Sequence, residues 1–160
     1  MNILAAREHS VAELGNKLHT KLFTRLQNKL KHKSYQDTDF NDQQKEHADA
    51  IIKALLEQLI EENLLNDERF AETFVRSRIV RGQGPIKIRH ELQERQVASE
   101  FIDEYLDESY EFWHETLENV RRKRFGNGFP LDYKEQARQS RFLYQRGFGA
   151  ELIRRLFNHL

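Results

Sequence analysis

Apolar residues recur along most of this chain with the period of an α-helix, and this periodicity limits its possible folds more than any other feature. The clearest segment is 48–65, where apolar side chains stand at i, i+3, i+4 and i+7 spacing. We expect one continuous apolar stripe on one helix face, made of Ala48, Ile51, Ile52, Leu55, Leu56, Leu59, Ile60 and Leu64. Only two prolines and seven glycines occur in 160 residues, which favours helices over a turn-rich β fold.

Capping residues and helix breakers divide this pattern into about eight or nine predicted helices. Ser10 and Glu13 have the spacing of a capping box at the start of one helix. Asn66, followed by two acidic residues, suits the start of another, because carboxylates are favourable near a helix N-terminus. The polar stretch 31–45 has no period, and we expect most of it to be a loop.

The second half of the chain carries similar signals. Gly82 and Gly84 should end one helix, and Pro85 suits the first position of the next. Ser99 is predicted to cap a fourth helix, and the last two helices fit residues 133–146 and 149–158. The sequence therefore predicts an all-α protein.

Two sequence patterns occur twice. The first is Arg95-x-Val97-x-x-Glu100-x-Ile102, which matches Arg146-x-Phe148-x-x-Glu151-x-Ile153. The second is Arg7-x-x-Ser10-x-x-x-Leu14-x-x-x-Leu18, which matches Arg81-x-x-Gly84-x-x-x-Ile88-x-x-x-Leu92. Either match alone could arise by chance between amphipathic helices, but together they favour three stacked three-helix modules. We place them at 1–65 (with the polar loop at 31–45), 66–109 and 110–160.

Composition excludes several classes of protein. The chain has no cysteine, so disulfides and thiolate zinc sites are excluded and a reducing compartment is expected. No apolar run approaches the roughly 18 residues of a membrane span, and the N-terminus lacks a signal-peptide core. We therefore expect a soluble, cytoplasmic protein.

The formal net charge of zero hides an uneven distribution along the chain. Residues 1–33 have seven basic and two acidic groups, for a net charge of +5. Residues 34–118 have nine basic and 21 acidic groups, for −12, and residues 119–160 have ten basic and three acidic groups, for +7. A solvated helical surface would explain one basic block; two flanking blocks make an anionic partner an equal alternative.

Catalytic and cofactor-binding motifs are absent from the sequence. His90 and Glu91 begin like a zinc-protease helix, but Glu94 stands where the second histidine should be. The glycines at 82 and 84 lack the third glycine of a dinucleotide-binding loop and the lysine of a P-loop. We therefore expect no enzyme activity, no cofactor and no metal.

Basic residues instead form two dense clusters. Arginine pairs with both carboxylates and phosphates, so the clusters suit a protein or a nucleic acid partner. For any single arginine, a surface ion pair with a neighbouring acid is an equally good explanation. The candidate partner-binding residues are Arg76, Arg78, Arg81, Lys87, Arg89, Arg95, Arg121, Arg122, Lys123, Arg124 and Arg146.

Four motifs resemble those of the RecX family, the regulators of bacterial recombination. They are Leu4-Ala5-Ala6-Arg7-Glu8-His9-Ser10-x-x-Glu13-Leu14-x-x-Lys17-Leu18; Leu65-Asn66-Asp67-x-Arg69-Phe70-Ala71-x-x-Phe74-Val75-x-x-Arg78; Gly82-x-Gly84-Pro85-x-x-Ile88-x-x-Glu91-Leu92; and Arg141-Phe142-Leu143-x-x-Arg146-Gly147-Phe148. The resemblance runs nearly from end to end. One departure is Gln96-Val97, where members of the family commonly have Gly-Ile.

The resemblance implies an elongated, curved array of three tandem three-helix modules. It also implies binding to the RecA recombinase within its filament on single-stranded DNA, with inhibition or remodelling of that filament. Recombination, DNA repair and the SOS response would be modulated as a result. No catalytic residue and no cofactor are implied.

Two other functions remain open at this point. The first is a module that binds single- or double-stranded DNA directly, for which the basic ends of the chain argue and the acidic middle argues against. The second is a helical adaptor with unrelated partners. We expect a RecA-binding regulator that is a monomer and binds DNA directly only weakly.

Overall fold

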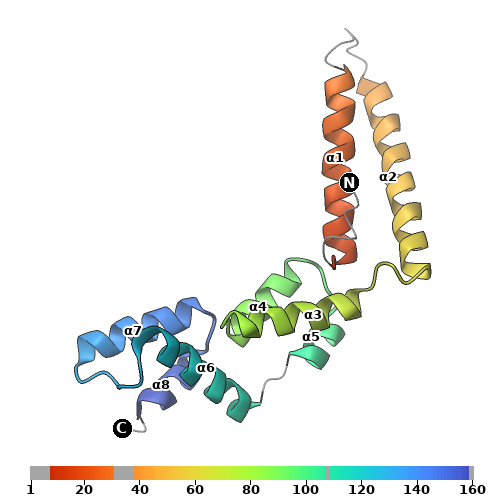
Figure 1. Ribbon diagram of the computed structural model, residues 1–160. Coiled ribbons are helices and arrows are strands. Elements are labelled where there is room, and N and C mark those ends of the chain that lie inside the picture. Colours follow the sequence, from red (N-terminus) through yellow and green to blue (C-terminus); the bar gives the residue numbers. More distant parts are fainter. Residues whose placement is uncertain (1–7, 31–37, 107–108, 159–160) are drawn as a thin grey trace. The chain divides into compact units, whose positions relative to one another are not determined.

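The computed structural model describes residues 8–30, 38–106 and 109–158, and the secondary structure in these ranges is entirely helical (Figure 1). The eight helices are α1 (Val11–Leu30), α2 (Thr38–Glu61), α3 (Asp67–Val80), α4 (Pro85–Gln93), α5 (Ser99–Tyr105), α6 (Tyr110–Phe125), α7 (Tyr133–Gln145) and α8 (Ala150–Asn158). The prediction of an all-α fold is confirmed.

The chain divides into two compact units, Met1–Phe70 and Ala71–Leu160, and the boundary lies within α3. In the first unit α1 and α2 lie side by side (Figure 1), with Leu14, Ala48 and Ile52 buried. In the second unit α6, α7 and α8 pack on one another around Trp113, Leu117, Leu143 and Phe148. The finer division into modules at 1–65, 66–109 and 110–160 remains a prediction.

The predicted loop at 31–45 is wrong for its second half, because α2 already begins at Thr38. Residues 31–37 lie outside the described part of the chain. From Asp42 to His47 nearly every side chain is exposed, so this end of α2 has no buried face to leave an apolar period in the sequence. Helix-forming residues such as Gln43, Lys45 and Glu46 nevertheless continue the helix.

The apolar stripe predicted for 48–65 is only partly buried. Ala48 and Ile52 are buried and Leu56 and Leu59 are half-buried, whereas Ile51, Leu55, Ile60 and Leu64 are exposed. The stripe is wider than the face that α1 covers, because one neighbouring helix shields only part of a helix surface.

The helix starts follow the predicted caps with one exception. The Ser10 hydroxyl accepts a hydrogen bond from the Glu13 N–H (3.1 Å), and the Asn66 side chain accepts one from the Arg69 N–H (3.0 Å). Pro85 is the first residue of α4, as predicted. The prediction for Ser99 is wrong: Ala98 is the cap of α5, and Ser99 is its first residue.

Four helices end in the same hydrogen-bonded turn, and three of these turns directly follow Arg81, Arg95 and Arg146 of the sequence repeats. α2, α3, α4 and α7 each close with one residue in the left-handed conformation: Asn63 (φ 53°), Gly82 (φ 71°), Gln96 (φ 55°) and Gly147 (φ 91°). In each turn the N–H of the next residue donates to a carbonyl five residues back, with N···O distances of 2.9, 3.0, 3.2 and 3.3 Å. This is the Schellman motif.

The turn at Gln96 therefore keeps the geometry of the turn at Gly147. The Gln96 N–H donates to the Gln93 carbonyl and the Gly147 N–H to the Tyr144 carbonyl, both at 2.9 Å. A left-handed glutamine costs about 1 kcal/mol more than a left-handed glycine. Val97 and Phe148 follow the two turns and are both buried, so the contacts of the next residue hold each turn in place.

Candidate interaction surface

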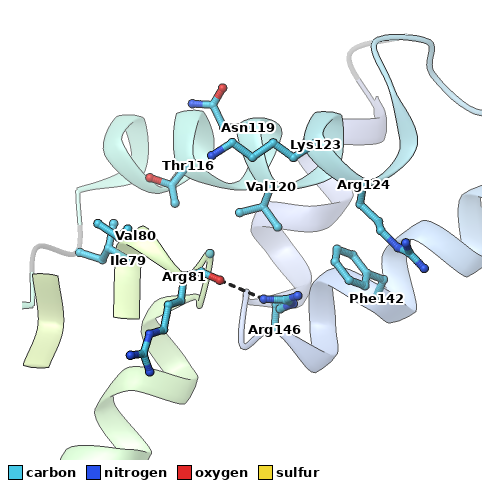
Figure 2. A pocket seen from close by; sticks show the side chains of 11 residues that line it. Ile79, Val80, Arg81, Thr116, Asn119, Val120, Lys123, Arg124, Phe142 and Arg146 are labelled. Atoms are coloured by element: carbon cyan, nitrogen blue, oxygen red, sulfur yellow. Dashed lines mark hydrogen bonds between the residues drawn. The ribbon is translucent and has the colours of Figure 1, made fainter. Parts of the chain in front are cut away.

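The second unit contains an open groove of about 520 Å³ beside the turn between α3 and α4 (Figure 2). Its walls come from the end of α3, one side of α6 and the end of α7. The lining residues are Ile79, Val80, Arg81, Gly82, Thr116, Asn119, Val120, Lys123, Arg124, Phe142 and Arg146. Four of the eleven predicted partner-binding residues line it: Arg81, Lys123, Arg124 and Arg146.

Gly82 allows the α3–α4 turn to lie directly against α6. A Cβ atom added to Gly82 would lie 2.9 Å from Cγ2 of Val120, closer than side-chain atoms normally approach. The residue also has a positive φ, which glycine adopts without strain. Arg81 is therefore held at the edge of the groove by a turn that only glycine fits well.

The opposite wall is fixed by contacts between two backbone turns. The Gly84 N–H donates to the Arg146 carbonyl (2.8 Å), and the Ile86 N–H donates to the Gly147 carbonyl (3.1 Å). A Cβ atom on Gly84 would lie 2.5 Å from the carbonyl carbon and oxygen of Gly147, and one on Gly147 would lie 2.3 Å from Cβ of Lys87. Glycines at these two positions let two turns, 63 residues apart in the chain, meet through their main chains.

Arg146 connects both sides of the groove. Its Nη1 donates to the Arg81 carbonyl at 3.0 Å, and its guanidinium lies over the Phe142 ring, 5.1 Å from the centroid. Figure 2 shows the hydrogen bond, with the Arg81 side chain extending away from α6. Arg146 therefore both braces the groove and contributes to its charge.

The charged residues that line the groove are all positive. Four cationic residues and no acidic one line it, and the side chain of one of them, Arg81, extends away from α6 (Figure 2). Within the described residues, the side chains of Arg81, Lys123 and Arg124 form no ion pair. The apolar surface of Val120 and Phe142 lies between the cations, and Val80 is 79 % exposed beside them. Such a surface can bind carboxylates or phosphates, because arginine and lysine side chains form charge-assisted hydrogen bonds with both and their combined field attracts anions.

Arg78 and Arg95 serve mainly to hold α3 and α4 together. Nε of Arg78 donates to Glu91 at 2.7 Å, and the side chains of Arg78 and Glu91 are each only 17 % exposed. The guanidinium groups of Arg78 and Arg95 lie over the Phe74 ring, at 4.2 and 4.9 Å from its centroid. These two predicted residues are engaged inside the unit and lie outside the groove.

Four further predicted residues lie elsewhere on the surface. Arg76 pairs with Glu72 (2.8 Å), Arg89 pairs with Asp103 (2.6 Å), and Arg122 hydrogen-bonds the Asn119 side chain. Lys87 is half-buried beside Gly147. The structure does not bring these four together with the groove, although nothing prevents a large partner from contacting them.

Among the eleven predicted partner-binding residues, Arg121 is buried: it is only 1 % exposed and cannot contact a partner. Nη1 donates to the Gly128 carbonyl (2.8 Å), Nη2 donates to the Asn127 carbonyl (3.2 Å), and the guanidinium lies 4.2 Å from the centroid of the Phe129 ring. Burial lowers the pKa of Arg121 below its usual value, with a smaller opposing contribution from Glu118. A run of four basic residues on a helix must point in different directions, and Arg121 points inward.

Sequence reasoning missed the uncharged residues of the groove. Thr116, Asn119 and Val120 lie on the same side of α6 as Lys123, at the three- and four-residue spacing of one helix face. That spacing was visible in the sequence. The contribution of Val80 was not, because only the tertiary structure shows that it is exposed.

No group of three or more metal-binding side chains is found among the residues that the structure describes. Within the same ranges, every helix is too short or too polar to cross a membrane.

These features define a class: within the described residues the protein is all-helical, with a recurring helix-ending turn and an open groove lined by cationic residues. Residues 66–106 match the model of the second three-helix domain of RecX, and residues 114–157 match that of the third. The chain belongs to the RecX family.

Individual relatives agree with this assignment. The chain is 39 % identical over 154 residues to regulatory protein RecX of Halorhodospira halophila, covering 96 % of this chain and 81 % of the relative. It is 34 % identical over 158 residues to regulatory protein RecX of Pseudomonas savastanoi pv. phaseolicola, covering 99 % and 86 %. The crystal structure of RecX from Lactobacillus salivarius has the same fold, with a TM-score of 0.63 at 18 % identity, covering 98 % of this chain and 88 % of that one. These relationships support a regulatory role, and none of the matched families is a family of enzymes.

Proposed function

We propose that this protein binds RecA and inhibits or remodels its filaments on single-stranded DNA, thereby modulating recombination, DNA repair and the SOS response. Membership of the RecX family and the motifs of the sequence support RecA as the partner. One structural observation carries the proposal: the acid-free cationic groove formed by Arg81, Lys123, Arg124 and Arg146. A RecA–DNA filament offers both carboxylates and phosphates to such a groove.

The mechanism follows from the chemistry of the groove. Its arginines can form bidentate pairs with carboxylates, and its apolar floor can cover an aliphatic side chain of the partner. A partner held in this way is anchored by charge and by burial at once. We propose that Arg81, Lys123 and Arg124 make the ionic contacts, with Arg146 supporting them from its bond to the Arg81 carbonyl.

The remaining parts of the proposal concern the state of the protein. We propose that it acts as a monomer in the cytoplasm, with no cofactor. Size-exclusion chromatography with light scattering measures the oligomeric state directly, and the monomer mass of 19.2 kDa is expected.

A charge-reversal variant tests the role of the groove. We expect Arg81→Glu, Lys123→Glu and Arg124→Glu together to weaken inhibition of the DNA-dependent RecA ATPase by at least tenfold in concentration, because three attractive contacts become repulsive. The matched control reverses three exposed cations elsewhere, Lys21, Arg25 and Arg154, and so changes the net charge equally. Circular dichroism should show unchanged helix content in both variants.

The outcomes separate the claims. If the wild-type chain fails to inhibit RecA, the proposed function is wrong. If the groove variant and the control behave alike, RecA is retained as the partner but the groove is not its site.

Direct DNA binding is a second candidate, because the same groove would also accept phosphates. It predicts that the wild-type chain binds single-stranded DNA tightly without RecA. It also predicts a steep fall in affinity as salt rises, since phosphate contacts release counterions. Weak binding with a shallow salt dependence favours the RecA proposal.

A further inference from the structure

The loop between α6 and α7 exposes two large apolar side chains that the fold does not use. Leu131 is exposed to its full extent, and Tyr133, the first residue of α7, is 85 % exposed. We call these two residues the loop tip; the loop is seen between α6 and α7 in Figure 1. Single exposed apolar residues are common on proteins. Here two of them lie close together on a loop whose other residues are held by the core.

The loop is held from the inside by Arg121. The Asn127 and Gly128 carbonyls accept hydrogen bonds from its guanidinium at 3.2 and 2.8 Å. The Phe129 ring covers the same guanidinium and meets the Phe157 ring of α8 edge-on, with 6.4 Å between centroids. Three consecutive residues are thus attached to the core of the second unit.

The loop is also fixed where it enters α7. Asp132 is the cap of this helix, and its carboxylate accepts a hydrogen bond from the Glu135 N–H at 2.8 Å. Pro130 restricts the backbone on the other side of Leu131. Leu131 therefore lies between two anchored residues, and its position is set before any partner arrives. Because the backbone on both sides is already held, binding has to order only the side chain of Leu131 and not the loop.

The surroundings of the loop tip are partly cationic. A shallow hollow of about 510 Å³ beside it is lined by Asp132, Tyr133, Lys134, Glu135, Ala137, Arg138 and Arg141. Both acids in this lining already have partners: Asp132 caps α7, and Glu135 accepts hydrogen bonds from Gln139 and Arg138, which hold its pKa below the usual value. Within the described residues, Lys134 and Arg141 form no ion pair, so they remain available to an acidic partner.

We propose that the loop tip is a preorganised anchor that inserts Leu131 and Tyr133 into an apolar pocket of a protein partner, with carboxylates at the pocket rim meeting Lys134 and Arg141. A protein fits better than a nucleic acid because a leucine has no aromatic face on which a base could stack. Tyrosine is enriched among the residues that supply most of the affinity of protein interfaces, and an aliphatic side chain can also serve as the anchor in a pocket. This inference rests on the proposed function, within which the pocket lies on a RecA subunit of the filament.

Binding measurements on substituted full-length chains test the proposal. The variants are Leu131→Ser, Tyr133→Ser and the double variant, and the matched control is Tyr144→Ser, which removes a 65 % exposed tyrosine from the other end of α7. Each chain carries a fluorophore, and its affinity is measured for RecA filaments on single-stranded DNA and, separately, for the DNA alone. We expect the double variant to bind filaments at least tenfold more weakly, and Tyr144→Ser to stay within twofold of wild type.

Two further measurements exclude a trivial loss of structure. The loop-tip side chains are exposed, so the thermal unfolding midpoint of each variant should match that of wild type. Leu131→Met keeps an apolar side chain of similar size and should retain most of the affinity that Leu131→Ser loses. If Leu131→Met binds as weakly as Leu131→Ser, apolar insertion is refuted.

The remaining outcomes are distinct. Wild-type binding to filaments with an unaffected double variant refutes the anchor and leaves the proposed function standing. Absence of wild-type binding refutes both. Weaker binding of Tyr133→Ser to DNA alone, equal to its loss on filaments, assigns the loop tip to nucleic acid and also refutes the protein pocket.

Discussion

The two units of the molecule achieve order in different ways. The first unit consists mainly of two long helices of 20 and 24 residues, with few buried side chains between them. The second unit packs several shorter helices around a larger hydrophobic core. Among the described residues, the buried apolar side chains number five up to Phe70 and fifteen from Ala71 onward. In the second unit tertiary packing therefore has the larger share in holding the fold, and in the first unit local helix formation has a larger share. The binding groove and the loop tip both lie in the densely packed unit.

This difference explains where exposed apolar surface is found. On α2, Ile51, Leu55 and Ile60 are exposed because α1 covers only one side of the helix. In the second unit the two most exposed aliphatic residues, Val80 and Leu131, lie beside a groove and on a tied loop, while Ile86 and Tyr144 are exposed on helices. Exposure on α2 reflects too few neighbours, whereas Leu131 is exposed on a loop whose flanking residues are held by hydrogen bonds.

The largest contrast should come from glycines in the two units. Gly147→Val should lower the unfolding free energy of the second unit by about 4 kcal/mol or more, because the new Cβ would overlap Lys87 and the residue has a positive φ. Gly15→Ala, on α1, should change stability by less than about 1 kcal/mol, since its Cβ would meet only the end of the Leu56 side chain at 3.3 Å. Urea denaturation followed by fluorescence of Trp113, which is buried in the second unit, measures the first effect. Circular dichroism measures the second. Equal losses in both variants would contradict the contrast between the units.

A medium effect is expected from the buried cation of the second unit. Arg121→Met should cost about 2–3 kcal/mol, because it leaves the Asn127 and Gly128 carbonyls without their donor while keeping most of the side-chain volume. Arg122→Met, one position along the same helix and exposed, should stay within about 0.5 kcal/mol of wild type. Denaturant titration compares the two. A harmless Arg121→Met would mean that the hydrogen bonds from Arg121 do not hold this loop.

The smallest effect distinguishes the two units by their response to pH. In the first unit, the Asp67 carboxylate accepts a hydrogen bond from the Val11 N–H at 2.8 Å and so ties the start of α3 to the start of α1. Burial raises the pKa of Asp67 above its usual value of 3.8, and the bond from Val11 opposes this in part. Between pH 3.8 and the higher pKa of the folded state, Asp67 therefore keeps a proton in the folded state that it has already released in the unfolded state. The contribution of Asp67 to stability is complete below pH 3.8 and is lost as the pH rises through the higher, folded-state pKa.

Asp67→Asn isolates this titration. The unfolding free energy of wild type relative to Asp67→Asn should fall as the pH is raised from below 3.8 toward neutrality, and then stay constant. Arg121, the corresponding tie in the second unit, stays charged over this range, so Arg121→Met should show no such difference. Denaturant titrations at a series of pH values provide the measurement. A difference that rises with pH would show that hydrogen bonding outweighs burial at Asp67.

Much of the local structure could be predicted from the sequence. The starts of α1, α3 and α4 were indicated by Ser10, Asn66 and Pro85, because capping and proline effects act within one helical turn. The sequence repeat also indicated the turns after Arg95 and Arg146. In both turns the next N–H donates to the carbonyl three residues back, and the N–H after it donates to the carbonyl five residues back. The beginning of α2 could not be predicted, since a helix with no buried face leaves no apolar period.

The candidate site was predictable only in part. Eleven cationic residues qualified by sequence, and four of them line one groove. In the sequence, Arg78 and Arg121 look like the groove residues, since all are cations within a basic cluster. In the structure, however, Arg78 pairs with Glu91, and Arg121 donates hydrogen bonds to two loop carbonyls. Ion pairing and burial depend on residues that the chain brings together from a distance, and a linear pattern does not contain them.

The sequence by itself determined that this chain is helical, where most of its helices begin and end, and which family it resembles. These properties depend on interactions within one turn or on motifs of a dozen residues. The tertiary structure alone decided which cations are free, which apolar residues are exposed, and that turns at Gly84 and Gly147 meet to support a groove. The physical reason is range: backbone hydrogen bonds of a helix are local, whereas burial and charge pairing are set by neighbours up to 65 residues away.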